Sequence, residues 1–170
     1  MPKTSTKPSS AGLAFLLSQV GAHSAARYAE RIAPLNLKPY HTGILRILGE
    51  ESGITQQALS DLLGMFPSRL VSLLDELQKM KLVERRESPN DRRTYALYLT
   101  KAGRIMLSRV GEASQLVQDD LCAALNAKER ALLRELLTRI VEQQQITPAV
   151  HPGYRQMETT CRDETGKNQC

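Results

Sequence analysis

The sequence has no tryptophan, and aromatic residues make up only 4% of its 170 positions. Hydrophobic residues still reach 41%, a normal share for a globular protein, so the core must be aliphatic. Leucine is abundant, while residues that favour strands are few outside positions 94–100. Because leucine is a good helix former and strands prefer β-branched and aromatic residues, this composition predicts a mostly helical protein.

Cysteine and histidine are also scarce. Three cysteines, an odd number without C-x-x-C spacing, do not form a disulfide framework or a zinc site. Three scattered histidines and the lack of a P-loop or a G-x-S-x-G motif leave no converging nucleophile and base. We therefore expect no enzyme activity, no metal and no cofactor. We expect Cys122 to act as a small hydrophobic residue, while the sequence assigns no role to Cys161 or Cys170.

Long apolar runs are missing as well. No stretch approaches the roughly 20 apolar residues that a membrane-spanning helix needs. The opening "MPKTSTKPSS" has no apolar core of the kind found in signal peptides. We therefore expect a cytoplasmic protein without membrane contact. Residues 1–10 and 147–170 are polar, and we expect a disordered arm and a disordered tail there.

Acidic residues are outnumbered by basic ones. The chain has 23 Lys and Arg against 18 Asp and Glu, a net charge of +5 and a pI of about 9.3. Seven basic and only three acidic residues fall within positions 81–104, a net +4 in 24 residues. Such a concentration of positive charge suggests an anionic partner.

Apolar residues at helical spacing predict six helices between the polar ends. The first covers residues 11–34, and the last two lie within 101–145. Prolines suited to a first helical turn and residues suited to N-caps mark where the others begin. These starting residues are Pro39, Thr55, Pro67, Thr100 and Asn126, the last with Glu129 in a capping-box spacing.

The stretch "TQQALSDLLGMFPSRLVSLLDEL", residues 55–77, is a candidate helix–turn–helix with a glycine in its turn. On the second helix, spacings of three and four place Ser68, Arg69, Ser72 and Glu76 on one side. Near a helix N-terminus, small donors and an arginine can reach base edges in the major groove, where arginine bonds guanine. The alternative is an ordinary solvated face.

The following stretch, "VERRESPNDRRTYALYLT", has two strand-like runs around a Pro-Asn-Asp turn. Arg92 and Arg93 lie near the tip of this predicted hairpin, where nothing in the protein can pack on them. A wing at this position would bring an arginine to the minor groove, which concentrates negative potential. Asp91 can orient one arginine through a weak, exposed salt bridge. The alternative is a solvated basic turn.

Taken in order, "PSRLVSLLDELQKMKLVERRESPNDRRTYALYLTKAGR" resembles the MarR (multiple antibiotic resistance regulator) family of winged helix–turn–helix repressors. The pieces "LVERR", D-x-R and "LYLTKAGR" are specific in combination, and the resemblance covers residues 11–145. It implies a homodimer built by the first and last helices, two winged domains that read a palindrome, and a small aromatic or phenolic ligand that weakens binding. It also makes Asp91 and Arg93 the wing pair, with the arginine entering the minor groove.

The sequence thus predicts a mostly α fold with a small β-hairpin wing, a winged helix–turn–helix with N- and C-terminal dimerisation helices. We expect one domain over 11–146, with dimerisation helices 11–34 and 101–145 around a DNA-binding lobe at 39–100. The expected function is a homodimeric repressor that binds a palindromic operator in double-stranded DNA and is released by a small ligand. Two alternatives remain open: a winged-helix protein–protein interaction module, and a transcriptional activator without a small-molecule effector.

The expected sites follow from these motifs and from the resemblance. A family-type pocket would lie between the dimer helices and the lobe, where Arg27 or His41 could receive a carboxylate or phenolate and tyrosines could stack on a ring. Alternatively, His41 is a helix-start residue satisfied by backbone. Members often have glycine where Lys81 stands and arginine where Ser72 stands, so the turn at Lys81 is less free to adopt positive φ. The expected ligand-binding residues are Arg27, Tyr28, Tyr40, His41 and Ile44, and the expected DNA-binding residues are Thr55, Gln56, Gln57, Pro67, Ser68, Arg69, Ser72, Asp91, Arg92 and Arg93.

Overall fold

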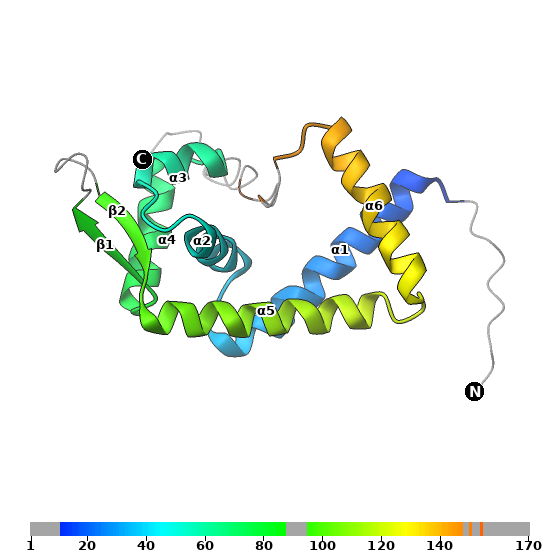
Figure 1. The fold of residues 1–170 in the computed structure, drawn as a ribbon, viewed down its shortest axis with the longest axis horizontal. Helices are drawn as coiled ribbons and strands as arrows, with labels where there is room; N and C mark the ends of the chain where they lie inside the picture. Colours follow the sequence, from blue (N-terminus) through cyan, green and yellow to red (C-terminus); the bar gives the residue numbers. More distant parts are fainter. Residues whose placement is uncertain (1–10, 88–94, 148–149, 151–153, 155–170) are drawn as a thin grey trace, which may run out of the picture.

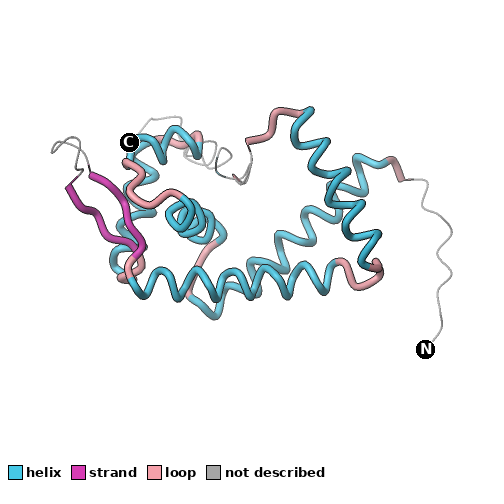
Figure 2. The backbone as a smooth tube through the Cα atoms, viewed as in Figure 1, coloured by secondary structure: helices cyan, strands magenta, loops and turns pink. Residues whose placement is uncertain are grey.

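The computed structural model describes residues 11–87, 95–147, Val150 and Tyr154. Helices dominate it, and two short strands form the only sheet among the described residues (Figures 1 and 2). This arrangement confirms the predicted mostly α fold with a β-hairpin wing. The elements in chain order are α1 (Leu13–Ile32), the 3₁₀ turn η1 (Ala33–Leu35), α2 (Pro39–Glu50), α3 (Gln56–Leu63), α4 (Pro67–Lys79), β1 (Val83–Glu87), β2 (Tyr95–Leu99), α5 (Lys101–Leu121) and α6 (Ala127–Gln143).

The predicted helix starts are confirmed by their hydrogen bonds. The Thr55 hydroxyl accepts from the backbone N–H of Ala58, and the Thr100 hydroxyl accepts from that of Gly103. Asn126 accepts from the backbone N–H of Glu129, whose carboxylate accepts from the backbone N–H of Asn126, forming a capping box. These caps satisfy N–H groups that a helix end otherwise leaves without a partner.

The wing is a two-stranded antiparallel ribbon whose register runs from Val83 opposite Leu99 to Glu87 opposite Tyr95. It is joined to the helix–turn–helix by an isolated bridge between Thr55 and Ala96. The turn before β1 places Lys81 at a φ of 58°, in the left-handed region that favours glycine. The lysine therefore adopts the conformation despite its side chain.

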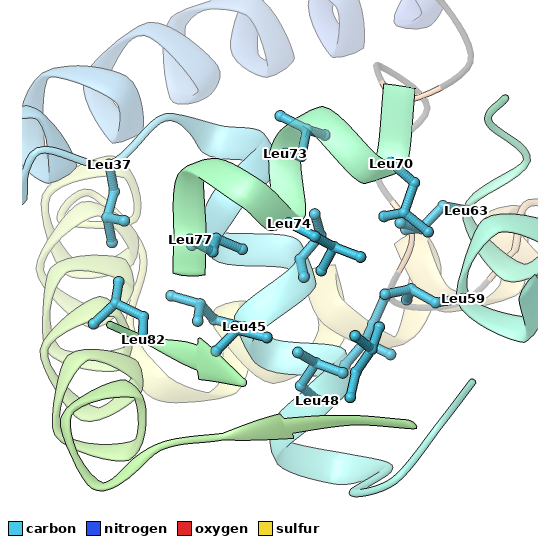
Figure 3. Close-up of a cluster of buried hydrophobic side chains, with 14 of the residues drawn as sticks. Leu37, Leu45, Leu48, Leu59, Leu63, Leu70, Leu73, Leu74, Leu77 and Leu82 are labelled. Carbon is cyan, nitrogen blue, oxygen red and sulfur yellow. The ribbon is translucent and has the colours of Figure 1, made fainter. Parts of the chain in front are cut away.

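Leucines from α2, α3 and α4 meet in one aliphatic core (Figure 3). This confirms the expectation drawn from the shortage of aromatic residues. The core fixes α4 against α2 and α3, and leaves one side of α4 at the surface. Its labelled members are Leu37, Leu45, Leu48, Leu59, Leu63, Leu70, Leu73, Leu74, Leu77 and Leu82.

The long helix α5 runs from the base of the hairpin to the region of α1 and α6, and α1 packs against it (Figure 1). Helix α6, by contrast, buries none of its residues. Apolar side chains on α1 and α6 are exposed, including Leu13 at 70% and Phe15 at 58%. No helix among the described residues is long and apolar enough to cross a membrane.

One residue of the polar C-terminal stretch differs from the expectation of a disordered tail. Tyr154 is only 2% exposed and belongs to the core cluster. Its side chain packs against α2 near Tyr40 and Gly43. The hydropathy of residues 147–170 gave no signal for this contact, because one aromatic side chain carries it.

Candidate nucleic-acid interface

The α3–α4 turn presents the N-terminus of α4 at the surface. Gly64 ends α3 with a φ of 61°, and the buried Ser60 hydroxyl donates to the Met65 carbonyl at 2.7 Å. Phe66 then occupies the N-cap position without a side-chain cap, and Pro67 begins the helix. Pro67 has no N–H, and the N–H groups of Arg69 and Leu70 both donate to the Phe66 carbonyl. Among the described residues, the Ser68 N–H is therefore the one at this helix end that is left for an external acceptor, and the helix dipole favours an anion there.

The exposed side chains at this end of α4 are those expected from spacing. Ser68, Arg69 and Ser72 are exposed, while Leu70 between them is fully buried. Among the residues that the structure describes, Arg69 makes no ion pair, so its guanidinium is free to bind a partner. On α3, Gln57 is exposed and its amide donates to Asp61, whereas Gln56 is half-buried.

Glu76, the fourth residue of the predicted polar side, has a different role. Its Oε2 atom accepts from Lys38 Nζ at 3.2 Å and lies 3.1 Å from His41 Nε2. Because His41 Nδ1 accepts from the backbone N–H of Lys38, Nε2 carries the proton of the neutral ring and donates to Glu76. Glu76 therefore links α4 to the start of α2.

Electrostatics at this link favour a neutral imidazole. Burial lowers the pKa of His41, which is only 2% exposed, and the neighbouring Glu76 carboxylate opposes that shift. The hydrogen bond from Lys38 lowers the pKa of Glu76. The geometry matches the alternative in which His41 is a satisfied helix-start residue, with the addition of a side-chain partner on α4.

Arg85 fixes the wing to α4, a role that sequence reasoning missed. Its guanidinium donates to Asp75 Oδ1 at 2.7 Å and to the side chain of Gln78. The Arg85 side chain is 20% exposed and the Asp75 side chain 47% exposed, so this contact is shielded from water on the Arg85 side only. The "LVERR" motif contains Arg85, but its partners on α4 depend on how the strand crosses the helix.

The predicted wing-tip residues Asp91, Arg92 and Arg93 lie outside the described residues. The strands that flank them are described, and β1 runs beside α4 (Figure 1). On the outer face of the ribbon, the Arg86 guanidinium lies 4.6 Å from the centre of the Tyr98 ring and also pairs with Glu84.

The five expected ligand-binding residues lie in different surroundings. Arg27 lines a cavity of about 360 Å³ between α1 and α5, whereas the half-buried Tyr28 beside it packs against the hydrophobic core. Tyr40 packs on Tyr154, His41 binds Glu76, and Ile44 is fully buried in the core. The cavity is lined by His23, Arg27, Arg31, Val117, Asp120 and Leu121.

The cationic groups of this cavity already have partners. Arg31 bonds Asp120 at 2.9 Å, and Arg27 bonds Glu30 on its own helix at 2.9 Å. An anionic ligand would therefore have to compete with two carboxylates. Cys122 follows α5 directly as its C-cap and is a half-buried free thiol. Over the described part of the chain, no group of three or more His, Cys, Asp or Glu could hold a metal ion.

Comparison with known proteins gives a consistent result. The family model described as "MarR family" matches residues 35–94, which span the helix–turn–helix and the first strand of the wing and end before β2. A putative transcriptional regulatory protein for the hcr operon of Thauera aromatica is 34% identical over 107 residues, covering 63% of this chain and 64% of that protein. The transcriptional repressor MprA of Escherichia coli is 35% identical over 100 residues, covering 56% and 57%. The chain thus spans less than two thirds of the length of these two relatives.

One of the similar solved structures contains operator DNA. The crystal structure of an Escherichia coli MarR mutant in complex with operator DNA matches with a TM-score of 0.65 and 26% identity, over 76% of this chain and 93% of that one. The two relatives and this neighbour are named as transcriptional regulators or are bound to an operator, in agreement with the expectation of a protein that is not an enzyme.

Proposed function

We propose that this chain, which is similar to proteins of the MarR family, regulates transcription in the cytoplasm by binding a palindromic operator in duplex DNA as a homodimer. The observation that carries the proposal is the exposed N-terminal face of α4, with Ser68, Arg69 and Ser72, beside a wing that Arg85 fixes to the same helix. The operator-bound neighbour supports it.

The chemistry of α4 suits the major groove. The Arg69 guanidinium, which makes no ion pair with the described residues, can bond guanine O6 and N7 together. The Ser68 hydroxyl can donate to a base or phosphate, and the exposed Ser72 hydroxyl, which donates to the Ser68 carbonyl, can turn to do the same. The Ser68 N–H at the start of α4 can bind a phosphate, which the helix dipole also favours. Residues 55–57 at the start of α3 contact the phosphate backbone of the DNA. The wing pair Asp91 and Arg93, together with Arg92, reaches the minor groove.

The dimer is proposed because α6 buries none of its residues against the described part of its own chain. Most of the stability of a helix in a protein comes from packing of its apolar face, so a 17-residue helix that buries no residue in the single chain is expected to pack on a partner. Its exposed leucines, together with those at the start of α1, form an apolar surface of the kind that marks an interface. A second copy that covers both helices would place two α4 helices to read half-sites about one helical turn apart.

The proposed direction of regulation is repression that a small aromatic acid relieves. The cavity lies between α1 and α5, which belong to the proposed dimerisation helices. A ligand carboxylate in this cavity would replace Asp120 as the partner of Arg31. Such a ligand shifts the equilibrium only by its differential affinity for the two states, typically about 1–3 kcal/mol, or roughly 5–150-fold. Operator DNA must weaken ligand binding by the same factor.

The DNA-binding proposal is tested by salt dependence. With roughly six to ten phosphate contacts, affinity for a labelled duplex should fall by about 10³–10⁵ between 50 and 200 mM salt. Fluorescence anisotropy measures this directly. Binding that is indifferent to salt, or that survives unchanged when Arg69 and Arg93 are both replaced by alanine, would favour a protein-interaction module instead.

A further inference from the structure

Tyr154 inserts its phenol ring against the backbone of α2. Its hydroxyl donates to the Tyr40 carbonyl oxygen at 2.6 Å, and its ring meets the Tyr40 ring edge-on at a centroid distance of 5.7 Å. With 2% exposure, it is as buried as the leucines of the core, although it lies beyond α6 in a polar segment. The contact joins residues 114 positions apart.

Gly43 makes room for this ring. A Cβ atom at position 43 would lie 2.0 Å from the Tyr154 hydroxyl oxygen and 3.0 Å from the ring carbon that bears it. Glycine inside a helix costs about 1 kcal/mol relative to alanine, and Gly43 has no positive φ that would require it. Space for the phenol therefore accounts for glycine at this position.

The polar end of the ring is satisfied by the helix itself. A backbone carbonyl has two lone pairs, so the Tyr40 oxygen can accept the phenol in addition to its helical N–H partner. Burial raises the pKa of Tyr154 well above its ordinary range, so the hydroxyl keeps its proton and continues to donate at neutral pH. The surface of α2 at this place therefore recognises both parts of a phenol, the flat ring and the hydroxyl donor.

We propose that the surface of α2 at Gly43 is a binding site for a phenol, and that Tyr154 of the same chain is its resident occupant. A free para-substituted phenol and Tyr154 compete for this one site, which is separate from the α1–α5 cavity. The inference concerns binding within the chain and does not depend on DNA recognition. The acceptor of the phenol, the Tyr40 carbonyl, is next in sequence to His41, and His41 bonds Glu76 on α4. The phenol site therefore adjoins the link between α2 and α4.

The test removes the occupant from the full-length chain and supplies its side-chain analogue. Tyr154→Ala should melt at a lower temperature than wild type, and para-cresol should restore it by roughly 3–6 °C at about ten times its dissociation constant. Toluene, which lacks the hydroxyl donor, should restore less. Tyr154→Phe is the matched control, because its ring still fills the site, and para-cresol should not raise its melting temperature.

A second variant tests the site from the other side. Gly43→Ala should lower the melting temperature of wild type, since its Cβ displaces the phenol, but not that of Tyr154→Ala, where the space is free. If Tyr154→Ala does not fold without a ligand, folding of this variant in para-cresol but not in toluene would likewise support the proposal. Equal para-cresol shifts in wild type, Tyr154→Phe and Tyr154→Ala, or an equal effect of Gly43→Ala in both backgrounds, would overturn the proposal.

Discussion

Arg69 is the residue on which base recognition should depend most. It is exposed on the first turn of α4, and no carboxylate among the described residues competes for it. Arg69→Ala should weaken operator binding by about 1–3 kcal/mol and relax base preference at one position in each half-site. Competition binding against single-base operator variants measures both effects.

Lys79→Ala is the matched control for Arg69, because Lys79 is an exposed cation at the opposite end of the same helix. Its loss should leave base preference unchanged. An Arg69→Ala variant that discriminates between operators as wild type does would remove Arg69 from direct readout.

His41 should make folding stability depend on pH. Because burial lowers its pKa, the unfolded chain binds more protons than the folded chain once the pH falls below the ordinary value of about 6.5. The free energy of unfolding should therefore decrease as the pH is lowered from 7.5 to 5. Glu76 adds no slope in this window, because its lowered pKa moves its own effect below 4.5.

The pH dependence is measured by chemical denaturation of His41→Gln beside wild type and His23→Gln, which replaces an exposed histidine. His41→Gln should flatten the decrease, and His23→Gln should retain it. If all three proteins lose stability in parallel between pH 7.5 and 5, the buried imidazole is not the source.

Local chemistry made part of this residue-level picture predictable. The caps at Thr55, Thr100 and Asn126 were identified because each cap and the backbone N–H that donates to it lie within three residues of each other. Glu76 was placed on a solvent-facing side because its partner His41 lies 35 residues away on another helix. Tyr154 was missed for the same reason, over a longer separation.

At the scale of elements, the wing and α4 should behave as one unit because Arg85 joins them. Arg85→Met leaves Asp75 and Gln78 without their donor and should lower the free energy of unfolding by about 1–3 kcal/mol. Arg86→Met on the same strand removes only a more exposed pair and should change it by about 1 kcal/mol or less. Urea denaturation of the two variants provides the comparison, and equal losses would contradict the anchoring role of Arg85.

Element boundaries show what the sequence could and could not determine. Helix starts were predictable from prolines and caps, and the hairpin from its turn and its alternating residues. The turn at Lys81 was expected to resist positive φ, yet its φ is 58°, because the backbone there must carry the chain from α4 into β1. The expected ligand-binding residues come from separate elements, and only packing decides which of them share a cavity.

At the scale of the whole molecule, the exposed leucines of α6 should hold two chains together. Leu137 is 38% exposed in the single chain, and a charge in its place would be buried in the proposed interface. Leu137→Asp should therefore shift the protein from dimer to monomer at micromolar concentration in sedimentation velocity. Thr138→Asp introduces the same charge on the polar side of α6 and should leave the dimer intact. Wild type that sediments as a monomer would contradict the proposed assembly.

The central claim is that two copies of α4, held at a fixed separation, read one operator. Hydroxyl-radical footprinting on a duplex selected from a random pool tests it most directly. The account predicts two protected patches on one face of the duplex, with centres about 10 base pairs apart, that disappear together in Leu137→Asp. A single protected patch, or a wild-type protein that protects no DNA at low salt, would contradict it.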